Sequence, residues 1–163
     1  MLYGAVVFDL DGTLMLSLDV KVKSAGALWC ETFSLVSRDA VEAAYRHHSG
    51  APRRQLFNKI AADVLGRQIS DQEYGYLSDE FTLRNINALR ETPFVTGAED
   101  LLRDILEAGI VMAISSSAES TEIDSRFNGR PESFFFQSIL GSHGEFHKET
   151  THGIFFHFDW GFF

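Results

Sequence analysis

The chain has 163 residues and a mass of 18.3 kDa, enough for one well-packed core that carries a small inserted subdomain, with little room for a second full domain. Hydrophobic residues make up 45% and charged residues 23%, a balance typical of soluble globular proteins and not of disordered or fibrous ones. The formal net charge of -9 disfavours the clustered basic surface that binds phosphate backbones, so we expect no nucleic-acid partner.

The first twelve residues, MLYGAVVFDLDG, contain neither a basic leader nor a long apolar run. We therefore expect no signal peptide, no membrane anchor and a cytoplasmic location. Within this segment, residues 2–8 form a short apolar run that ends abruptly at Asp9, a pattern typical of a fully buried strand followed by a turn.

From about residue 17 to residue 90 the apolar residues recur at three- and four-residue spacing, which indicates helices. Gly50-Ala51-Pro52 and the segment 66–70 divide this region into three or four helices, and Ser70 is placed to cap the last of them. An all-helical insertion is therefore predicted after the first strand.

Residues 98–108 carry the next helical pattern, and they are followed at once by a second apolar strand at 110–114. A third apolar run at 134–140 is predicted to be a strand as well. This order predicts an α/β, doubly wound (Rossmann-like) parallel sheet core made of residues 1–15 and 89–163, with an α-helical cap subdomain at 16–88.

Asp9 and Asp11 stand at the carboxyl end of the first strand, where open α/β sheets bind their ligands. Their alternate spacing points both carboxylates to the same side, and Gly12 permits a tight turn whose N–H groups can face an anion. A divalent cation such as Mg²⁺ would balance two carboxylates and a phosphate. The plainer interpretation is that Asp-Gly is turn chemistry alone.

The segment VVFDLDGTL resembles the first motif of the haloacid dehalogenase superfamily, and PFVTGAEDLLRDILEAGIVMAISSS is similar to its stretch leading to the second motif. The resemblance implies that Asp9 is the nucleophile, which becomes an aspartyl-phosphate, and that Asp11 is the general acid/base. It also implies that Mg²⁺ is bound by Asp9 and by the backbone carbonyl of Asp11.

The same resemblance implies a phosphate-binding set made of Leu10, Gly12, Ser115, Ser116 and Lys148. Ser115 would offer its hydroxyl and Ser116 its N–H, although a serine triplet can also be a polar loop that caps a helix. Lys148 would be the third-motif lysine, with a solvated surface lysine as the alternative.

By position, the insertion corresponds to the helical cap of the phosphoglycolate phosphatase and β-phosphoglucomutase branch, which closes over the site and selects substrates. Arg53 and Arg54 are candidates for contacting the non-reacting part of a small phosphorylated substrate. An exposed basic helix face is the alternative for both.

The fourth motif of the family, an acidic pair, has no counterpart after Lys148, where only Asp159 remains within a phenylalanine-rich segment. We therefore expect a core that is incomplete at its C-terminus. Three functions stay open: a Mg²⁺-dependent phosphatase of a small phosphorylated metabolite, a catalytically impaired phosphate-binding fragment, and a sugar-phosphate mutase. The sequence leaves the oligomeric state open.

Overall fold

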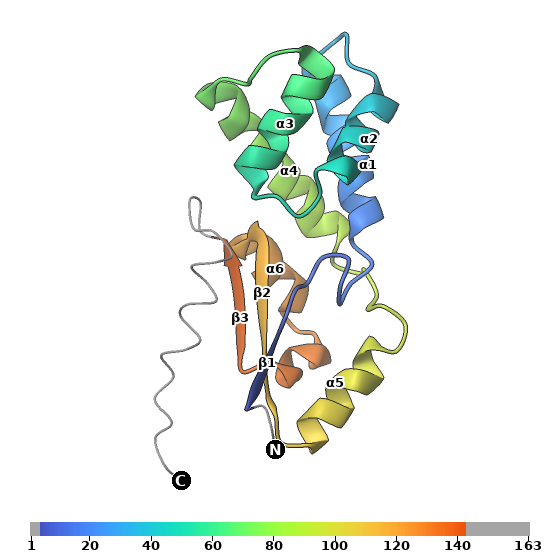
Figure 1. Cartoon of the computed structure of the whole chain (residues 1–163), viewed down its shortest axis with the longest axis vertical. Coiled ribbons are helices and arrows are strands. Elements are labelled where there is room, and N and C mark those ends of the chain that lie inside the picture. Colours follow the sequence, from blue (N-terminus) through green and yellow to red (C-terminus); the bar gives the residue numbers. More distant parts are fainter. Residues whose placement is uncertain (1–3, 143–163) are drawn as a thin grey trace.

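Three parallel strands form the centre of the structure, a computed structural model that describes residues 4–142 (Figure 1). The strands are β1 (Ala5–Phe8), β2 (Val111–Glu119) and β3 (Ser138–Ser142), and they lie in the order β1-β2-β3. Ala5 to Phe8 pair in register with Val111 to Ile114. The predicted α/β fold with parallel strands is confirmed.

Two helices and a short 3₁₀ helix accompany the sheet: α5 (Ala98–Glu107), α6 (Ser120–Phe127) and η1 (Pro131–Phe135). Helix α5 is preceded by Gly97, whose φ of 83° lies in the left-handed region that glycine adopts without steric cost. The sheet and these helices share one apolar core, whose fully buried members include Leu10, Met15, Leu102 and Ile114.

The chain between β1 and α5 folds into four helices: α1 (Leu18–Thr32), α2 (Arg38–His47), α3 (Arg53–Leu65) and α4 (Asp71–Ala88). They pack around a second core centred on Trp29, Phe57 and Phe81, distinct from the core beneath the sheet. Figure 1 shows these helices beyond the carboxyl ends of the strands. Of the helices that the structure describes, none is long and apolar enough to cross a membrane.

Local signals in the sequence account for the boundaries of α3 and α4. Gly66 ends α3 with a φ of 68°. Ser70 starts α4 with a capping box, in which its hydroxyl accepts the backbone N–H of Glu73 at 3.2 Å and the Glu73 carboxylate accepts the backbone N–H of Ser70 at 2.7 Å. The predicted cap at Ser70 is therefore confirmed.

The predicted strand at 134–140 is wrong in its first half. Residues 131–135 form η1, and β3 begins only at Ser138. Pro131 has a φ suited to a helical first turn and no N–H to offer a strand ladder, so the aromatic run starts as a turn. Phe134 is 88% exposed, whereas Phe136 is buried against Phe8 and Phe127.

Two further strand predictions differ from the structure. The second strand does not stop at residue 114, because β2 continues through the serine triplet to Glu119 alongside β3. The first strand is not fully buried: Ala5 and Val7 are exposed, since β1 is an edge of the sheet that the structure describes. An apolar run thus indicated a strand correctly without fixing how much of it is covered.

The aromatic core of the insertion gives a stability prediction. Phe57 is fully buried and its ring contacts Trp29 and Phe81 edge to face, so Phe57→Ala should lower the free energy of unfolding by about 3–5 kcal/mol. Leu35 is 98% exposed, and Leu35→Ala should change the free energy of unfolding by less than about 0.5 kcal/mol. Urea denaturation followed by circular dichroism measures both, and equal losses would contradict this account of the core.

Candidate active site

The loop after β1 holds both candidate carboxylates in place by its own backbone hydrogen bonds. The carbonyl of Leu10 accepts the N–H groups of Leu14 and Met15, each at 3.0 Å, while the Leu10 side chain is fully buried. Gly12 has a φ of 79°, and its N–H donates to the carbonyl of Met15 at 2.9 Å. This N–H is therefore engaged within the loop, and the predicted phosphate-binding role of Gly12 stays a prediction.

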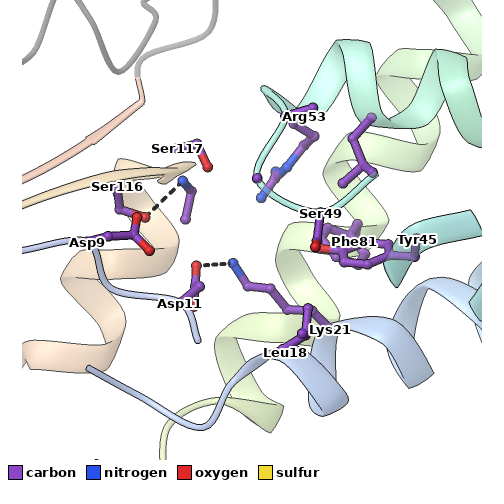
Figure 2. A pocket seen from close by; sticks show the side chains of 14 residues that line it. Asp9, Asp11, Leu18, Lys21, Tyr45, Ser49, Arg53, Phe81, Ser116 and Ser117 are labelled. Carbon is purple, nitrogen blue, oxygen red and sulfur yellow. Dashed lines mark hydrogen bonds and ion pairs between the residues drawn. The ribbon is translucent and has the colours of Figure 1, made fainter. Parts of the chain in front are cut away.

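Asp9 and Asp11 line a cavity of about 230 Å³ between the sheet and the helical insertion (Figure 2). Ser116 and Ser117 complete the wall on the sheet side. The opposite wall comes from the insertion, with Lys21 and Arg53 as its basic residues. The remainder of that wall is mostly apolar or hydroxyl-bearing, with Leu18, Tyr45, Ser49, Leu56 and Phe81 among its residues.

Each carboxylate oxygen of Asp11 accepts at least one strong hydrogen bond. Oδ1 accepts from the Ser17 hydroxyl and from Nη1 of Arg126, each at 2.6 Å, and Oδ2 accepts from Nζ of Lys21 at 2.6 Å. Burial raises the pKa of Asp11, but the positive charges of Lys21 and Arg126 outweigh it and hold this pKa well below its usual range. Asp11 is therefore a carboxylate in this arrangement.

Besides Asp9 and Asp11, a further carboxylate, that of Glu122 on α6, lies behind the basic wall and is fully buried. Its Oε1 contacts Nζ of Lys21 at 2.8 Å and also pairs with Arg126, while its Oε2 accepts from Nη2 of Arg53 at 2.9 Å. Burial raises the pKa of Glu122, yet the positive charges of Lys21, Arg126 and Arg53 outweigh burial and bring this pKa below its ordinary value. We call Asp11, Lys21, Arg53, Glu122 and Arg126 the ion cluster.

Asp9 lies in a different environment from Asp11. It is half-buried, and its Oδ2 accepts the hydroxyl of Thr13 at 3.0 Å. Two carboxylates at neighbouring positions thus have distinct surroundings, which suits them to distinct chemical roles.

The parallel register places the serine triplet beside the carboxylates, since Phe8 pairs with Ile114 just before Asp9 and Ser115. The Ser115 hydroxyl is buried and has no hydrogen-bond partner within the described part of the chain. Ser116 lines the cavity, and its hydroxyl accepts the N–H of Ala118 at 3.1 Å. Ser117 also lines the cavity, although the sequence pattern did not single it out.

The basic candidates separate in the structure. Arg53 lines the cavity, where Nη1 also donates to the Thr82 hydroxyl at 2.5 Å. Arg54 does not line it; its half-exposed side chain pairs with Asp71 and stacks on Tyr74. The geometry therefore supports Arg53 and not Arg54 as a cavity residue. Lys148 lies outside the described residues, as does Asp159.

The ion cluster also contains residues that were not predicted from the sequence: Lys21, Glu122 and Arg126. A signal for two of them exists in the sequence, because Glu122 and Arg126 are spaced i,i+4 and flank Ile123 and Phe127, which are buried. Charged residues interleaved with the apolar side of a short helix indicate buried ion pairs. Lys21 carries no comparable local signal.

The donor set near Asp9 fits Mg²⁺ in chemical type but is small. Mg²⁺ prefers oxygen ligands and retains several waters, and carboxylates are its usual protein ligands. Within residues 4–142, no cluster of three or more acidic, histidine or cysteine residues is arranged to hold a metal ion. Because lysine and arginine engage the carboxylate of Asp11, Asp9 would supply the principal carboxylate ligand.

Comparison with known proteins identifies the lineage of this arrangement. A family model described as haloacid dehalogenase-like hydrolase matches residues 6–154. None of the curated proteins matches the chain.

Solved structures share the fold at low sequence identity. A predicted phosphatase from Clostridium acetobutylicum has a TM-score of 0.72 at 21% identity, covering 87% of this chain and 62% of its own. A predicted phosphoglycolate phosphatase from Haemophilus somnus has a TM-score of 0.67 at 15% identity, covering 85% and 62%. CbbY from Rhodobacter sphaeroides, in complex with xylulose-(1,5)bisphosphate, has a TM-score of 0.64 at 16% identity, covering 86% and 64%. The chain thus spans less than two thirds of the length of these proteins.

The ion cluster predicts a stability that depends on pH. Glu122→Gln leaves three buried cations without one of their carboxylate partners, and should lower the free energy of unfolding at pH 7 by about 3 kcal/mol. Since the pKa of Glu122 is lower in the folded chain than its ordinary value of 4.5, its contribution is present above that pH. The difference between the two proteins should shrink as the pH falls below about 4.5. Denaturation curves between pH 3 and pH 7 measure this, and a constant difference would contradict the assignment.

Proposed function

Because the chain belongs to the haloacid dehalogenase-like hydrolase family, we propose that it is a phosphomonoesterase of a small phosphorylated metabolite, with an aspartyl-phosphate intermediate on Asp9. The observation that carries the proposal is the pair of carboxylates after β1, which line one cavity together with Ser116, Ser117 and Lys21. The phosphatases among the structural neighbours support it as relatives in fold.

In the first step, an oxygen of Asp9 attacks the phosphorus atom of the substrate. The bond from phosphorus to the ester oxygen breaks, and the leaving alcohol takes a proton from Asp11. Asp9 suits the attack because its half-buried side chain lines the cavity at the carboxyl end of β1, whereas Lys21 and Arg126 hold the two oxygens of Asp11.

Proton donation by Asp11 requires a change in its contacts, since Lys21 and Arg126 favour the carboxylate form and hold its pKa low. Lys21 belongs to α1 of the insertion, and a displacement of that helix would remove one of the two cations. In the second step, water attacks the phosphorus of the aspartyl-phosphate while Asp11 accepts its proton. The carboxylate form that Lys21 and Arg126 favour suits that step, in which the bond between Asp9 and phosphorus breaks, phosphate leaves and Asp9 is regenerated.

The serines and the basic wall supply the remaining functions. Ser116 and Ser117 line the cavity and would donate to a phosphoryl oxygen, whereas the buried Ser115 hydroxyl, which lacks a partner in the described structure, does not line it. Lys148 would add a positive charge near the phosphoryl group. When bound, Mg²⁺ would reduce the charge repulsion between Asp9 and the phosphoryl group. The insertion closes one side of the cavity and would limit access of water.

Removal of the nucleophile tests the proposal. With Mg²⁺, the chain should hydrolyse p-nitrophenyl phosphate, and Asp9→Asn should lower kcat by at least about 1,000-fold because the amide oxygen is a poor nucleophile. Asp39→Asn on α2 makes the same charge change at an exposed position and should leave kcat unchanged. Turnover in the Asp9→Asn protein equal to that of the unmodified chain would rule out this mechanism, and binding without turnover in the unmodified chain would indicate a phosphate-binding module.

A proton donor at Asp11 predicts a dependence on the leaving group. Asp11→Asn should lower kcat/KM for an alkyl phosphate by about 100- to 10,000-fold, the range of general acid catalysis. The loss for p-nitrophenyl phosphate should be clearly smaller, since its leaving group departs without a proton. Steady-state rates with both substrates decide the matter, and equal losses would assign Asp11 a purely structural role.

A further inference from the structure

Two basic side chains face the cavity within the described residues, and both already have carboxylate partners. Lys21 pairs with Asp11 and Glu122, and Arg53 pairs with Glu122 at 2.9 Å and with Glu119 at 3.8 Å. The positive charge of this wall is therefore compensated from within the protein. A wall built to bind a second anionic group of a ligand would offer cations without such partners.

Glu122 compensates these charges from the side of the basic wall that faces away from the cavity. Glu122 does not line the cavity and is fully buried on α6, behind Lys21 and Arg53. Its two oxygens bind different cations of the insertion, with Lys21 on Oε1 and Arg53 on Oε2. Figure 2 shows Arg53 and Lys21 on the insertion side of the cavity, facing Asp9 and Asp11. The side chains of Lys21 and Arg53 are thus both held by the carboxylate of Glu122.

A ligand carboxylate or second phosphate in this cavity would lose its hydration without gaining a cation that lacks a carboxylate partner. The negative charges of Glu122 and Glu119 behind this wall would also repel an anionic group in the cavity, and such like charges disfavour binding. A neutral group meets a better match, because the rest of the insertion wall offers Tyr45, Ser49 and Phe81 for apolar contact and hydrogen bonding.

We propose that Glu122 determines the charge of the accepted substrate: the part that is not transferred is neutral, and phosphate esters with a second anionic group are disfavoured. The inference rests on the proposed phosphatase function of the same cavity and adds the substrate class. The complex of CbbY from Rhodobacter sphaeroides with a bisphosphate shows that a protein of similar fold holds a doubly anionic ligand. The present chain should differ because of the carboxylate behind its basic wall.

A matched ligand pair tests the proposal directly. Phosphoglycolate and its amide share one shape and differ by the negative charge of the carboxylate. Calorimetric titration in the presence of Mg²⁺, with the Asp9→Asn protein so that neither ligand is consumed, should show the amide binding at least about tenfold more tightly. Tighter binding of the acid, equal binding, or binding of neither ligand would overturn the proposal.

The role of Glu122 itself is tested by adding Glu122→Gln to that protein. The substitution removes one carboxylate partner from Lys21 and one from Arg53, and the preference for the amide should fall at least about tenfold or reverse. Asp124→Asn on the same helix removes an exposed carboxylate and should leave the preference unchanged. If Glu122 had a purely structural role, its substitution would weaken the binding of both ligands to the same extent, and that result would overturn its assignment.

Circular dichroism confirms that each variant is folded. If Glu122→Gln does not fold, the ligand pair measured on the protein that retains Glu122 still decides the substrate class. Hydrolysis of p-nitrophenyl phosphate by the unmodified chain is measured alongside. Turnover combined with a preference for the acid would overturn the inference and leave the phosphatase intact, whereas selective binding of the amide without turnover would support the inference and contradict the proposed activity.

Discussion

The pairing of buried charges between the sheet layer and the helical insertion is the interaction on which the site depends. Glu122 and Arg126 lie on α6 beside the sheet, whereas Lys21 and Arg53 come from α1 and α3 of the insertion. Buried charges are tolerated only when each has a well-placed partner, because removing one partner leaves the others uncompensated in a medium of low polarity. The ion cluster therefore fixes how the insertion meets the strands, and the cavity exists at that junction.

The same pairing gives two neighbouring aspartates different chemistry. Arg126 and Lys21 each contact both Asp11 and Glu122, so the carboxylate of Asp11 is held from two directions. Asp9 is half-buried and accepts the hydroxyl of Thr13. Position in the sequence cannot separate a nucleophile from an acid/base in an Asp-x-Asp pair, and here the two cations that hold Asp11 mark it as the more firmly held carboxylate.

Asp9 and Asp11 could be predicted because strand, turn and carboxylates are adjacent in the sequence, and the edge of a parallel sheet where they emerge is a general ligand site. Ser116, which lines the cavity, followed from the second strand by the same reasoning, whereas Ser115 is buried and does not line it. The i,i+4 spacing of Glu122 and Arg126 could indicate that they pair with each other, but their contacts with the site could not be predicted, since Arg126 meets Asp11 across 115 positions of sequence and Arg53 meets Glu122 across 69. Only the packing of α6 against the insertion brings them together. The third strand starts later than the apolar run predicts. Aromatic residues are common in strands, but Pro131 starts a 3₁₀ helix that includes the first two phenylalanines of the run.

The central claim, that Asp9 and not Asp11 or a serine receives the phosphoryl group, can be tested by chemical trapping. Borohydride added during turnover reduces an aspartyl-phosphate to homoserine, and fragmentation of the resulting peptide by mass spectrometry identifies the position. We expect homoserine at position 9, with aspartate retained at position 11 and no phosphate on Ser115, Ser116 or Ser117. Homoserine at position 11, or a phosphorylated serine with position 9 unchanged, would contradict the account.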